Sequence, residues 1–259
     1  MSYLSKRLLT RVYFDILSKI ATMVKLRLQE LREEVLQANL ELVRRGLVLY
    51  TFGNVSGISR EDELVVIKPS GVPYEEMKPE HMVVTNLDGK IVEGKLRPSS
   101  DLPTHLVLYE AFGEIGGIAH THSDYATAWA QARQPIPCFG TTHADYFHGP
   151  VPVTAAMRDH EIASHYETNT GHAIVHAFDQ ADCASVPAVL VAHHGPFTWG
   201  QDPPSAAHNA VVLESVARMA YLTMVINHDA SAISRGLHDK HYLRKHGSNA
   251  YYGQAKDRR

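Results

Sequence analysis

The sequence contains little cysteine and little excess charge of either sign. Only two of its 259 residues are cysteines, Cys138 and Cys183, and they form no CxxC motif. Isolated cysteines are typical of a protein kept in a reducing compartment rather than of a disulfide-linked secreted protein, so we expect a cytoplasmic protein. The formal net charge of −3 gives no overall basic field, which argues against nucleic acid and anionic membranes as partners.

Long apolar runs are also missing. A helix that spans a bilayer needs roughly 20 apolar residues, and the most apolar helical segment, residues 211–226, is interrupted by Glu214 and Arg218. The chain has no linker rich in proline or serine, no internal repeat and no low-complexity run. We therefore expect no membrane segment and one main domain, which we place at residues 27–254.

Residues 1–26 differ from the rest of the chain in charge. They hold one acidic residue, Asp15, and five basic ones: Lys6, Arg7, Arg11, Lys19 and Lys25. Basic segments with almost no acid are typical of transit peptides, yet the apolar core and small-residue cleavage site of a secretory signal are missing. The alternatives are an extra surface helix and an over-long start with Met23 as the initiator.

Hydrophobic spacing predicts helices that alternate with short strands. Apolar residues recur at helical spacing over residues 27–45, with Gly46 as the expected C-cap. Pro203-Pro204 opens a second long predicted helix that reaches about Asn227. Shorter helices are expected from Pro103, after Ser123 as a capping residue, and over residues 159–167.

Short β-rich segments predict the sheet. Residues 82–85 and 90–92 flank Asp88-Gly89, a dipeptide typical of a hairpin turn. Further strands are expected at residues 63–67, 117–122, 151–153 and 186–192. Several connections are too short to contain a helix, so the strands cannot all be parallel. We expect an α/β fold of three layers, α/β/α, with a central mixed, mainly antiparallel sheet.

Two histidine motifs are candidates for a metal site. His120 and His122 are alternate residues of a predicted strand, so both imidazoles face one side and can bind one ion. Neutral imidazole suits zinc and similar metals, which need three or four ligands, so an HxH pair alone is more often incidental. A third ligand can come from His193-His194, of which strand geometry allows only one to join the pair. Gly195 then permits a sharp turn.

Three turns rich in glycine and serine are candidates for an anion site. They lie at residues 53–56, 68–71 and 98–101. Serine hydroxyls and turn amides can donate to a phosphate, and Lys68 can add positive charge. None of the turns matches GxxxxGK[ST] or GxGxxG, so a nucleotide is not the expected ligand. Ordinary turn chemistry explains the same residues equally well.

Asp145 is a candidate proton-transfer group, because an aspartate whose pKa is raised by burial can act as a general acid or base. Capping of the following segment is the simpler explanation. The C-terminal run of residues 239–253 would on composition alone be a solvated tail.

Taken together, these segments resemble the class II (fuculose-phosphate) aldolase family, in particular its epimerase branch. The resemblance runs from about Leu28 to Gln254 and depends on separated blocks in the family's order, among them GNVSGIS, VIKPSGVPY, GGIAHTHS, GTTHADYFHG, VLVAHHGPFTWG, DKHYLRKHG and AYYGQ. It implies a metal-dependent isomerase of carbohydrate metabolism that interconverts L-ribulose 5-phosphate and D-xylulose 5-phosphate, as in arabinose catabolism. It also implies a homotetramer whose active sites are shared between subunits.

The resemblance implies a role for each matching position. One Zn²⁺ per subunit, or Mn²⁺ or Co²⁺, is implied at His120, His122 and His194, with Asp101 close to the metal and counted with the catalytic residues. The implied contacts to substrate and phosphate are Gly53, Asn54, Ser70, Gly71, Ser99, Ser100 and, more weakly, His241. The implied proton-transfer residues are Asp145 and Tyr252, the latter from a neighbouring subunit. Phe52 and Ala192 depart from the family's usual tryptophan and histidine.

The implied reaction explains these residue types. The C4 hydrogen of a ketopentose phosphate is not adjacent to the carbonyl, so cleavage between C3 and C4 is easier than deprotonation. The enediolate that forms needs a Lewis acid, and the C4 oxygen needs a proton-transfer group on each face. A class II aldolase is the alternative, but Asp101 in place of glutamate, together with Tyr252, favours the epimerase. An adducin-like interaction module is less favoured, because the three histidines are intact.

Overall fold

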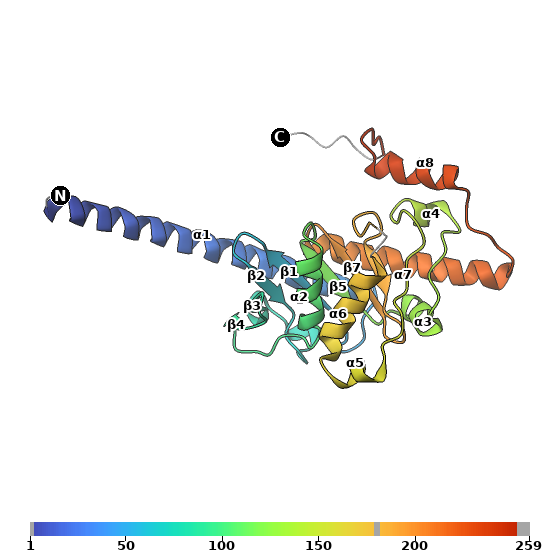
Figure 1. Cartoon of the computed structure of the whole chain (residues 1–259), viewed down its shortest axis with the longest axis horizontal. Coiled ribbons are helices and arrows are strands. Elements are labelled where there is room, and N and C mark those ends of the chain that lie inside the picture. Colours follow the sequence, from blue (N-terminus) through green and yellow to red (C-terminus); the bar gives the residue numbers. More distant parts are fainter. Residues whose placement is uncertain (1–2, 179–181, 253–259) are drawn as a thin grey trace.

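A computed structural model describes residues 3–178 and 182–252 (Figure 1). The predicted domain end at Gln254 lies outside the described residues. Seven strands form one sheet in the order β4-β3-β2-β1-β5-β7-β6. Their bounds are β1 Asn54–Ser59, β2 Leu64–Ile67, β3 Val83–Asn86, β4 Ile91–Glu93, β5 Gly117–His120, β6 Ala188–Leu190 and β7 Pro196–Gly200.

All six pairings between neighbouring strands are antiparallel, and an isolated parallel bridge joins Val153 to Leu190. The predicted mainly antiparallel sheet is confirmed, as is the hairpin at Asp88-Gly89, which joins β3 to β4. Residues 54–56, which we expected in a turn, begin β1 instead.

The described part of the chain contains eight α-helices. They are α1 Tyr3–Arg44, α2 Leu102–Ala111, α3 Asp124–Ala132, α4 Thr141–Ala144, α5 Asp159–Ala163, α6 Tyr166–Ala177, α7 Pro203–Ile226 and α8 Arg235–His246, with short 3-10 turns at Tyr74–Glu76 and Pro79–His81. Helices α1 and α7 pack together and against β1, β5 and β7, whereas α2 and α6 pair with each other (Figure 1).

Apart from the exposed edge strand β4, the strands are buried on both faces, which explains their apolar character. In β2, Val65 and Ile67 join the core that includes α2 and α6 residues, whereas Val66 joins Leu28 and Val35 of α1. Alternate residues of one strand therefore serve opposite layers. The predicted three-layer α/β/α architecture is confirmed.

Helix α1 is longer than the helix predicted at residues 27–45. It continues without a break from Tyr3 to Arg44, so the N-terminal extension and the domain share one helix, whose first part projects from the body (Figure 1). The predicted cap is correct: Gly46 has φ +70, its amide donates to Val43, and the amide of Leu47 donates to Leu42. This pair of bonds is a Schellman motif, which requires a left-handed residue at this position.

Four further predicted elements differ from the structure. The strand expected at residues 117–122 ends at His120, so His122 lies just after the strand. The strand expected at residues 151–153 is reduced to isolated bridges at Val151 and Val153. The helix expected at 159–167 is two helices, α5 and α6, separated at His165, whose φ of +54 interrupts helical geometry. The strand expected at 186–192 ends at Leu190, and residues 191–195 form a hairpin turn into β7.

Helix α7 matches its prediction and is the one helix in the described ranges that is long and apolar enough to cross a membrane. Its N-terminal two-thirds nevertheless packs into the domain, with Ala206, Leu213 and Val216 buried. Glu214 also contributes to the fold, because its carboxylate accepts hydrogen bonds from the amides of Tyr125 and Ala126, both at 2.9 Å. It caps α3, a role that we had expected of Ser123, whose side chain makes no capping bond.

Candidate active site

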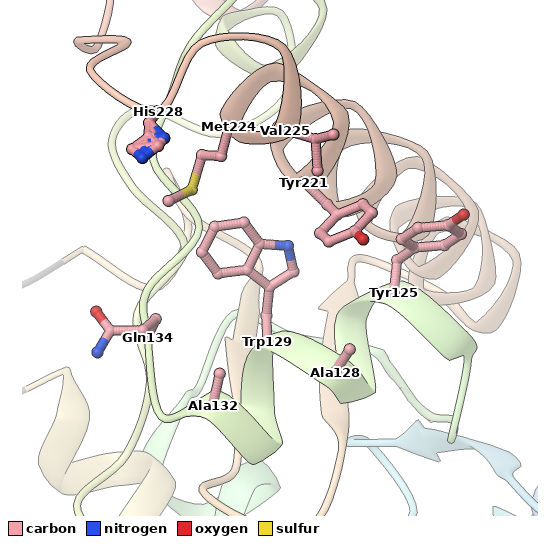
Figure 2. A pocket seen from close by; sticks show the side chains of 9 residues that line it. All are labelled: Tyr125, Ala128, Trp129, Ala132, Gln134, Tyr221, Met224, Val225 and His228. Carbon is pink, nitrogen blue, oxygen red and sulfur yellow. The ribbon is translucent and has the colours of Figure 1, made fainter.

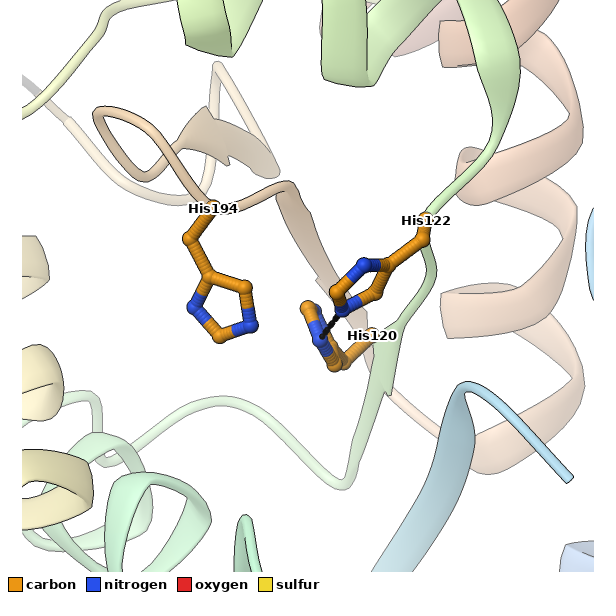
Figure 3. Close-up of side chains that lie close together, drawn as sticks. All are labelled: His120, His122 and His194. Atoms are coloured by element: carbon orange, nitrogen blue, oxygen red, sulfur yellow. Dashed lines mark hydrogen bonds between the residues drawn. The ribbon is translucent and has the colours of Figure 1, made fainter.

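Three histidines from two distant parts of the chain converge on one point. His120 ends β5, His122 follows two residues later, and His194 lies in the turn between β6 and β7 (Figure 3). Each offers a ring nitrogen, and the three nitrogens all lie within 4.8 Å of one another. The Nε2 atoms of His120 and His122 are 3.0 Å apart. This is the spacing that ligands of one divalent ion require.

Neighbouring groups fix the ring of His120. Its Nδ1 donates to the carbonyl of Pro196 at 2.9 Å, which leaves Nε2 unprotonated and free to bind an ion. Phe197 stacks on the same ring with centroids 4.2 Å apart. Pro196 and Phe197 both belong to β7, which pairs with β5, so one strand fixes the ring of His120 through a hydrogen bond and a stacking contact.

The turn between β6 and β7 selects the third histidine. His193 is exposed and has φ +63, a left-handed backbone that turns the chain so that His194 faces the other two rings. The selection therefore comes from a turn and not from strand alternation. Gly195 is needed for close approach, since a Cβ at this position would lie 2.7 Å from the carbonyl oxygen of Thr121.

Burial keeps these imidazoles neutral. It lowers the pKa of His120 to about 3, and it also lowers the pKa values of His122 and His194. A neutral imidazole is the form that binds a metal. The donor set therefore fits a zinc-like ion, which combines with three nitrogens and keeps further positions open.

Asp101 lies beside the three histidines, at the N-cap of α2. Asn54 Nδ2 donates to its Oδ2 at 2.6 Å. Burial raises the pKa of Asp101, but the neighbouring imidazoles of His120, His105 and His194 and the hydrogen bond from Asn54 outweigh this effect, so the pKa lies below its usual value. Asp101 is therefore ionised at neutral pH, although it is not one of the three groups within 4.8 Å of each other.

A cavity of about 400 Å³ contains these groups together with all the predicted substrate contacts except His241. Its lining is Thr51, Phe52, Gly53, Asn54, Lys68, Ser70, Gly71, Ser99, Ser100, Asp101, His120, His122, Tyr166, Glu167 and His194. Residues of all three glycine- and serine-rich segments identified in the sequence thus meet at one place, next to the histidines.

Three lining residues were missed from the sequence: Thr51, Tyr166 and Glu167. Tyr166 and Glu167 begin α6, most of which the sequence did not predict. The hydroxyl of Tyr166 lies 3.5 Å from His194 Nδ1. Lys68 is also more important than expected. Its ammonium group is buried and donates to the carbonyls of Thr51 and Pro69, and burial lowers its pKa to about 8 despite the nearby charge of Asp101.

A buried hydrogen-bonded chain lies behind the cavity. His105 Nδ1 is 2.6 Å from the hydroxyl of Ser56, which is 2.8 Å from the hydroxyl of Tyr109. Burial lowers the pKa of His105 to about 4. The amide of His105 also donates to the carbonyl of Asp101, so this chain anchors the start of α2.

The remaining predicted residues form a second cluster outside this cavity. Asp145 follows α4 and accepts hydrogen bonds from His241 Nδ1 at 3.0 Å and from Arg244 at 3.1 and 2.8 Å. The ring of Tyr252 lies 4.7 Å from the guanidinium of Arg244 and 4.6 Å from the ammonium of Lys245. Burial raises the pKa of Asp145, but these cationic partners outweigh it and lower the pKa. One chain therefore carries both sets of residues but does not bring them together.

The similarity of this chain to known proteins agrees with its geometry. The L-ribulose-5-phosphate 4-epimerase UlaF of Salmonella paratyphi A is 53% identical over 227 residues, which cover 88% of this chain and 100% of that protein. The solved structure of an L-fuculose 1-phosphate aldolase matches with a TM-score of 0.71 at 26% identity, over 83% of this chain and 95% of that one.

A second L-fuculose-1-phosphate aldolase, from Thermus thermophilus, shares the fold with a TM-score of 0.62 at 21% identity, over 77% of this chain and 97% of that one. The family model for the class II aldolase and adducin N-terminal domain matches residues 33–221. This chain belongs to the class II aldolase and adducin family.

Proposed function

We propose that this protein is a metal-dependent epimerase that interconverts L-ribulose 5-phosphate and D-xylulose 5-phosphate by cleaving and re-forming the C3–C4 bond. The observation that carries the proposal is the single cavity in which three neutral imidazoles and an ionised Asp101 lie beside residues of three glycine- and serine-rich segments. The 53% identity to an L-ribulose-5-phosphate 4-epimerase supports the same reaction.

His120, His122 and His194 are the proposed ligands of one Zn²⁺ per subunit, with Asp101 beside them; Mn²⁺ and Co²⁺ suit the same donors. When bound, the ion supplies a Lewis acid for the oxygens of the enediolate. Asp101 is held in place by Asn54, and its negative charge offsets part of the charge of the ion.

The turns of the cavity are the proposed site for the substrate phosphate. Ser70, Gly71, Ser99 and Ser100 offer hydroxyls and amides, and Lys68 adds a cation at the cavity wall. Gly53 and Asn54 hold the sugar backbone. When the C4 hydroxyl loses its proton and the C3–C4 bond breaks, the products are glycolaldehyde phosphate and the enediolate of dihydroxyacetone. The phosphate contacts keep the aldehyde in place while it presents its other face.

Proton transfer at the C4 oxygen needs a group on each face, and Asp145 and Tyr252 are the proposed pair. They lie outside the cavity of their own chain and are joined through Arg244. We therefore propose a homotetramer in which a neighbouring subunit supplies Asp145, Tyr252 and His241 as one unit. The two cysteines are free, which agrees with a cytoplasmic location.

A coupled assay on L-ribulose 5-phosphate tests the reaction. Metal-stripped protein should be inactive, Zn²⁺ should restore formation of D-xylulose 5-phosphate, and little glycolaldehyde phosphate should appear in solution. Release of glycolaldehyde phosphate at the rate of turnover would instead identify an aldolase, the activity of the structural relative. Full activity after metal removal would overturn the proposed role of the three histidines.

A further inference from the structure

Helix α2 is joined to strand β1 by two sets of side-chain hydrogen bonds. In the first, here called the first rung, Asn54 Nδ2 donates to Asp101 Oδ2 at 2.6 Å. In the second rung, the hydroxyl of Ser56 lies 2.6 Å from His105 Nδ1 and 2.8 Å from the hydroxyl of Tyr109. The three residues of the second rung are each at most 1% exposed. Their polar atoms therefore depend on one another for hydrogen bonding.

The spacing of the two rungs follows from the geometry of a strand and a helix. Asn54 and Ser56 are alternate residues of β1, so their side chains lie on one face of the sheet, roughly 6.7 Å apart along the strand. Asp101 and His105 are four residues apart at the start of α2, which places them on one face of the helix with a rise of about 6 Å. Because the two spacings agree, both rungs form together, and each fixes the position of α2 for the other.

We propose that His105 and Ser56 are positioning residues that hold Asp101 beside the three histidines of the metal site. Asp101 is the N-cap of α2, and its carbonyl accepts a hydrogen bond from the amide of His105 at 3.1 Å. The carboxylate therefore moves with the first turn of the helix, and the second rung fixes how that turn is rotated over β1. The inference rests on the proposed function, because it concerns the carboxylate beside the proposed metal ligands.

The ring of His105 acts through its position rather than through contact with the substrate. It lies behind the cavity and is not one of the lining residues. Its Nε2 makes no hydrogen bond within residues 3–178 and 182–252, so Nδ1 is the atom that anchors the ring. The ring also meets Phe197 edge-on, with centroids 6.0 Å apart, and Phe197 stacks on His120. A change at Ser56 is therefore the cleaner test, because it breaks the second rung and keeps this ring contact.

Substitutions on both sides of the second rung test the proposal. Ser56→Ala removes the hydroxyl, and His105→Leu removes the imidazole. His105→Asn is the conservative variant, because its amide oxygen can take the place of Nδ1 and accept from Ser56. Thr198→Val is the matched control. It deletes a buried hydroxyl that donates to the carbonyl of Ala206 at 2.8 Å, on the side of the sheet that faces α7.

Zinc affinity is measured by competition with a chromogenic chelator, and the urea midpoint of unfolding is measured for each metal-free, full-length variant. We expect Ser56→Ala and His105→Leu to lower zinc affinity on the order of 10-fold, the effect of losing a group that orients the surroundings of a metal. His105→Asn should retain most of the affinity. Thr198→Val should bind zinc like the unmodified protein although its urea midpoint falls.

A double variant shows whether the effect passes through Asp101. Ser56→Ala added to Asp101→Asn should lower zinc affinity little further, because the carboxylate that the second rung positions is already gone. Additive losses in the double variant, or an equal loss of zinc affinity in Thr198→Val and Ser56→Ala, would overturn the inference.

Zinc binding does not depend on turnover, so the two proposals can fail separately. An unmodified protein that shows this pattern of zinc affinities but lacks epimerase activity would refute only the proposed function. Unchanged zinc affinity in Ser56→Ala and His105→Leu, in a protein that is an active epimerase, would refute only the positioning role. An unmodified protein that binds no zinc would refute both.

Discussion

Asn54 and His120 lie directly opposite each other where β1 pairs with β5. Asn54 holds Asp101, and His120 is the most buried of the three converging histidines. The register of two central strands therefore sets the distance between the carboxylate and the metal ligands. A shift of one residue in this pairing would turn one of the two side chains to the other face of the sheet, so the geometry of the site depends on this register.

The first prediction separates the two adjacent histidines. His194→Ala should lose zinc and activity together, because two imidazoles do not hold the ion. His193→Ala should keep most of its zinc, since His193 is exposed and only shapes the turn. Metal analysis of the dialysed proteins checks this. Equal zinc loss in both variants would show that the assignment of His194 is wrong.

The second prediction concerns Tyr252. Tyr252→Phe should lower kcat by on the order of 10²-fold through the loss of a proton-transfer group, and it should not change the unfolding midpoint, because the side chain is exposed.

Co-expression tests whether a neighbour supplies this residue. Tyr252→Phe and His194→Ala chains mixed equally should regain about a quarter of the full activity, because a quarter of the sites in a random ring pair an intact cavity with an intact Tyr252. An inactive mixture would place Tyr252 in the site of its own chain.

The third prediction is a loss of stability in mild acid. Burial lowers the pKa values of His105 and His143 from 6.5 to about 4. Between these values the unfolded chain binds more protons than the folded one, so stability decreases as pH falls below 6.5. Each histidine should contribute a slope of up to about 1.4 kcal/mol per pH unit.

Urea unfolding of the metal-free protein at pH 7, 6 and 5 measures this slope. His143→Gln keeps a donor for the carbonyl of Gly149, which His143 Nε2 contacts at 2.8 Å. This variant should lose the contribution of one histidine to the slope of the unfolding free energy against pH. An unchanged slope would mean that His143 is not neutral in the folded protein.

The fourth prediction concerns the cap of α3. Glu214→Ala should lower the free energy of unfolding by about 1–2 kcal/mol, because two amides at the start of α3 lose their acceptor. Glu110→Ala, at an exposed position on α2, is the control and should change stability little. Chemical denaturation compares the two. An equal loss of unfolding free energy in the two variants would show that Glu214 does not stabilise α3 as a cap.

Local sequence patterns predicted the elements that depend on local chemistry. The helix before Gly46, the hairpin at Asp88-Gly89 and the helix from Pro203 all carry their own start or stop signals. The sequence missed α6 beyond residue 167, since Gly171 and two threonines break its apolar pattern. There α2 packs so closely that a Cβ on Gly171 would lie 2.7 Å from Val107. Tertiary packing, rather than propensity, makes this segment helical.

The site was predicted in a similar way. The histidines and turns were identified from short motifs and from the resemblance to the family, and the structure brings them into one cavity. The sequence could not reveal that Tyr166 and Glu167 line this cavity, because a helix without a clear pattern delivers them. Nor could spacing reveal that Asp145 and Arg244, 99 positions apart, pair outside it. Contacts between distant segments leave no local signal.

The placement of the two tryptophans gives the chain an internal optical reporter. Trp199 is buried in the core between Phe112 and Phe178. Trp129 instead lines the open cavity between α3 and the C-terminal turns of α7 (Figure 2). A subunit that covers this cavity shields the indole of Trp129 from water and leaves Trp199 untouched. Dilution of the protein should therefore change the emission wavelength and the iodide quenching of Trp129 alone. The Trp129→Phe variant, in which only Trp199 fluoresces, is the control.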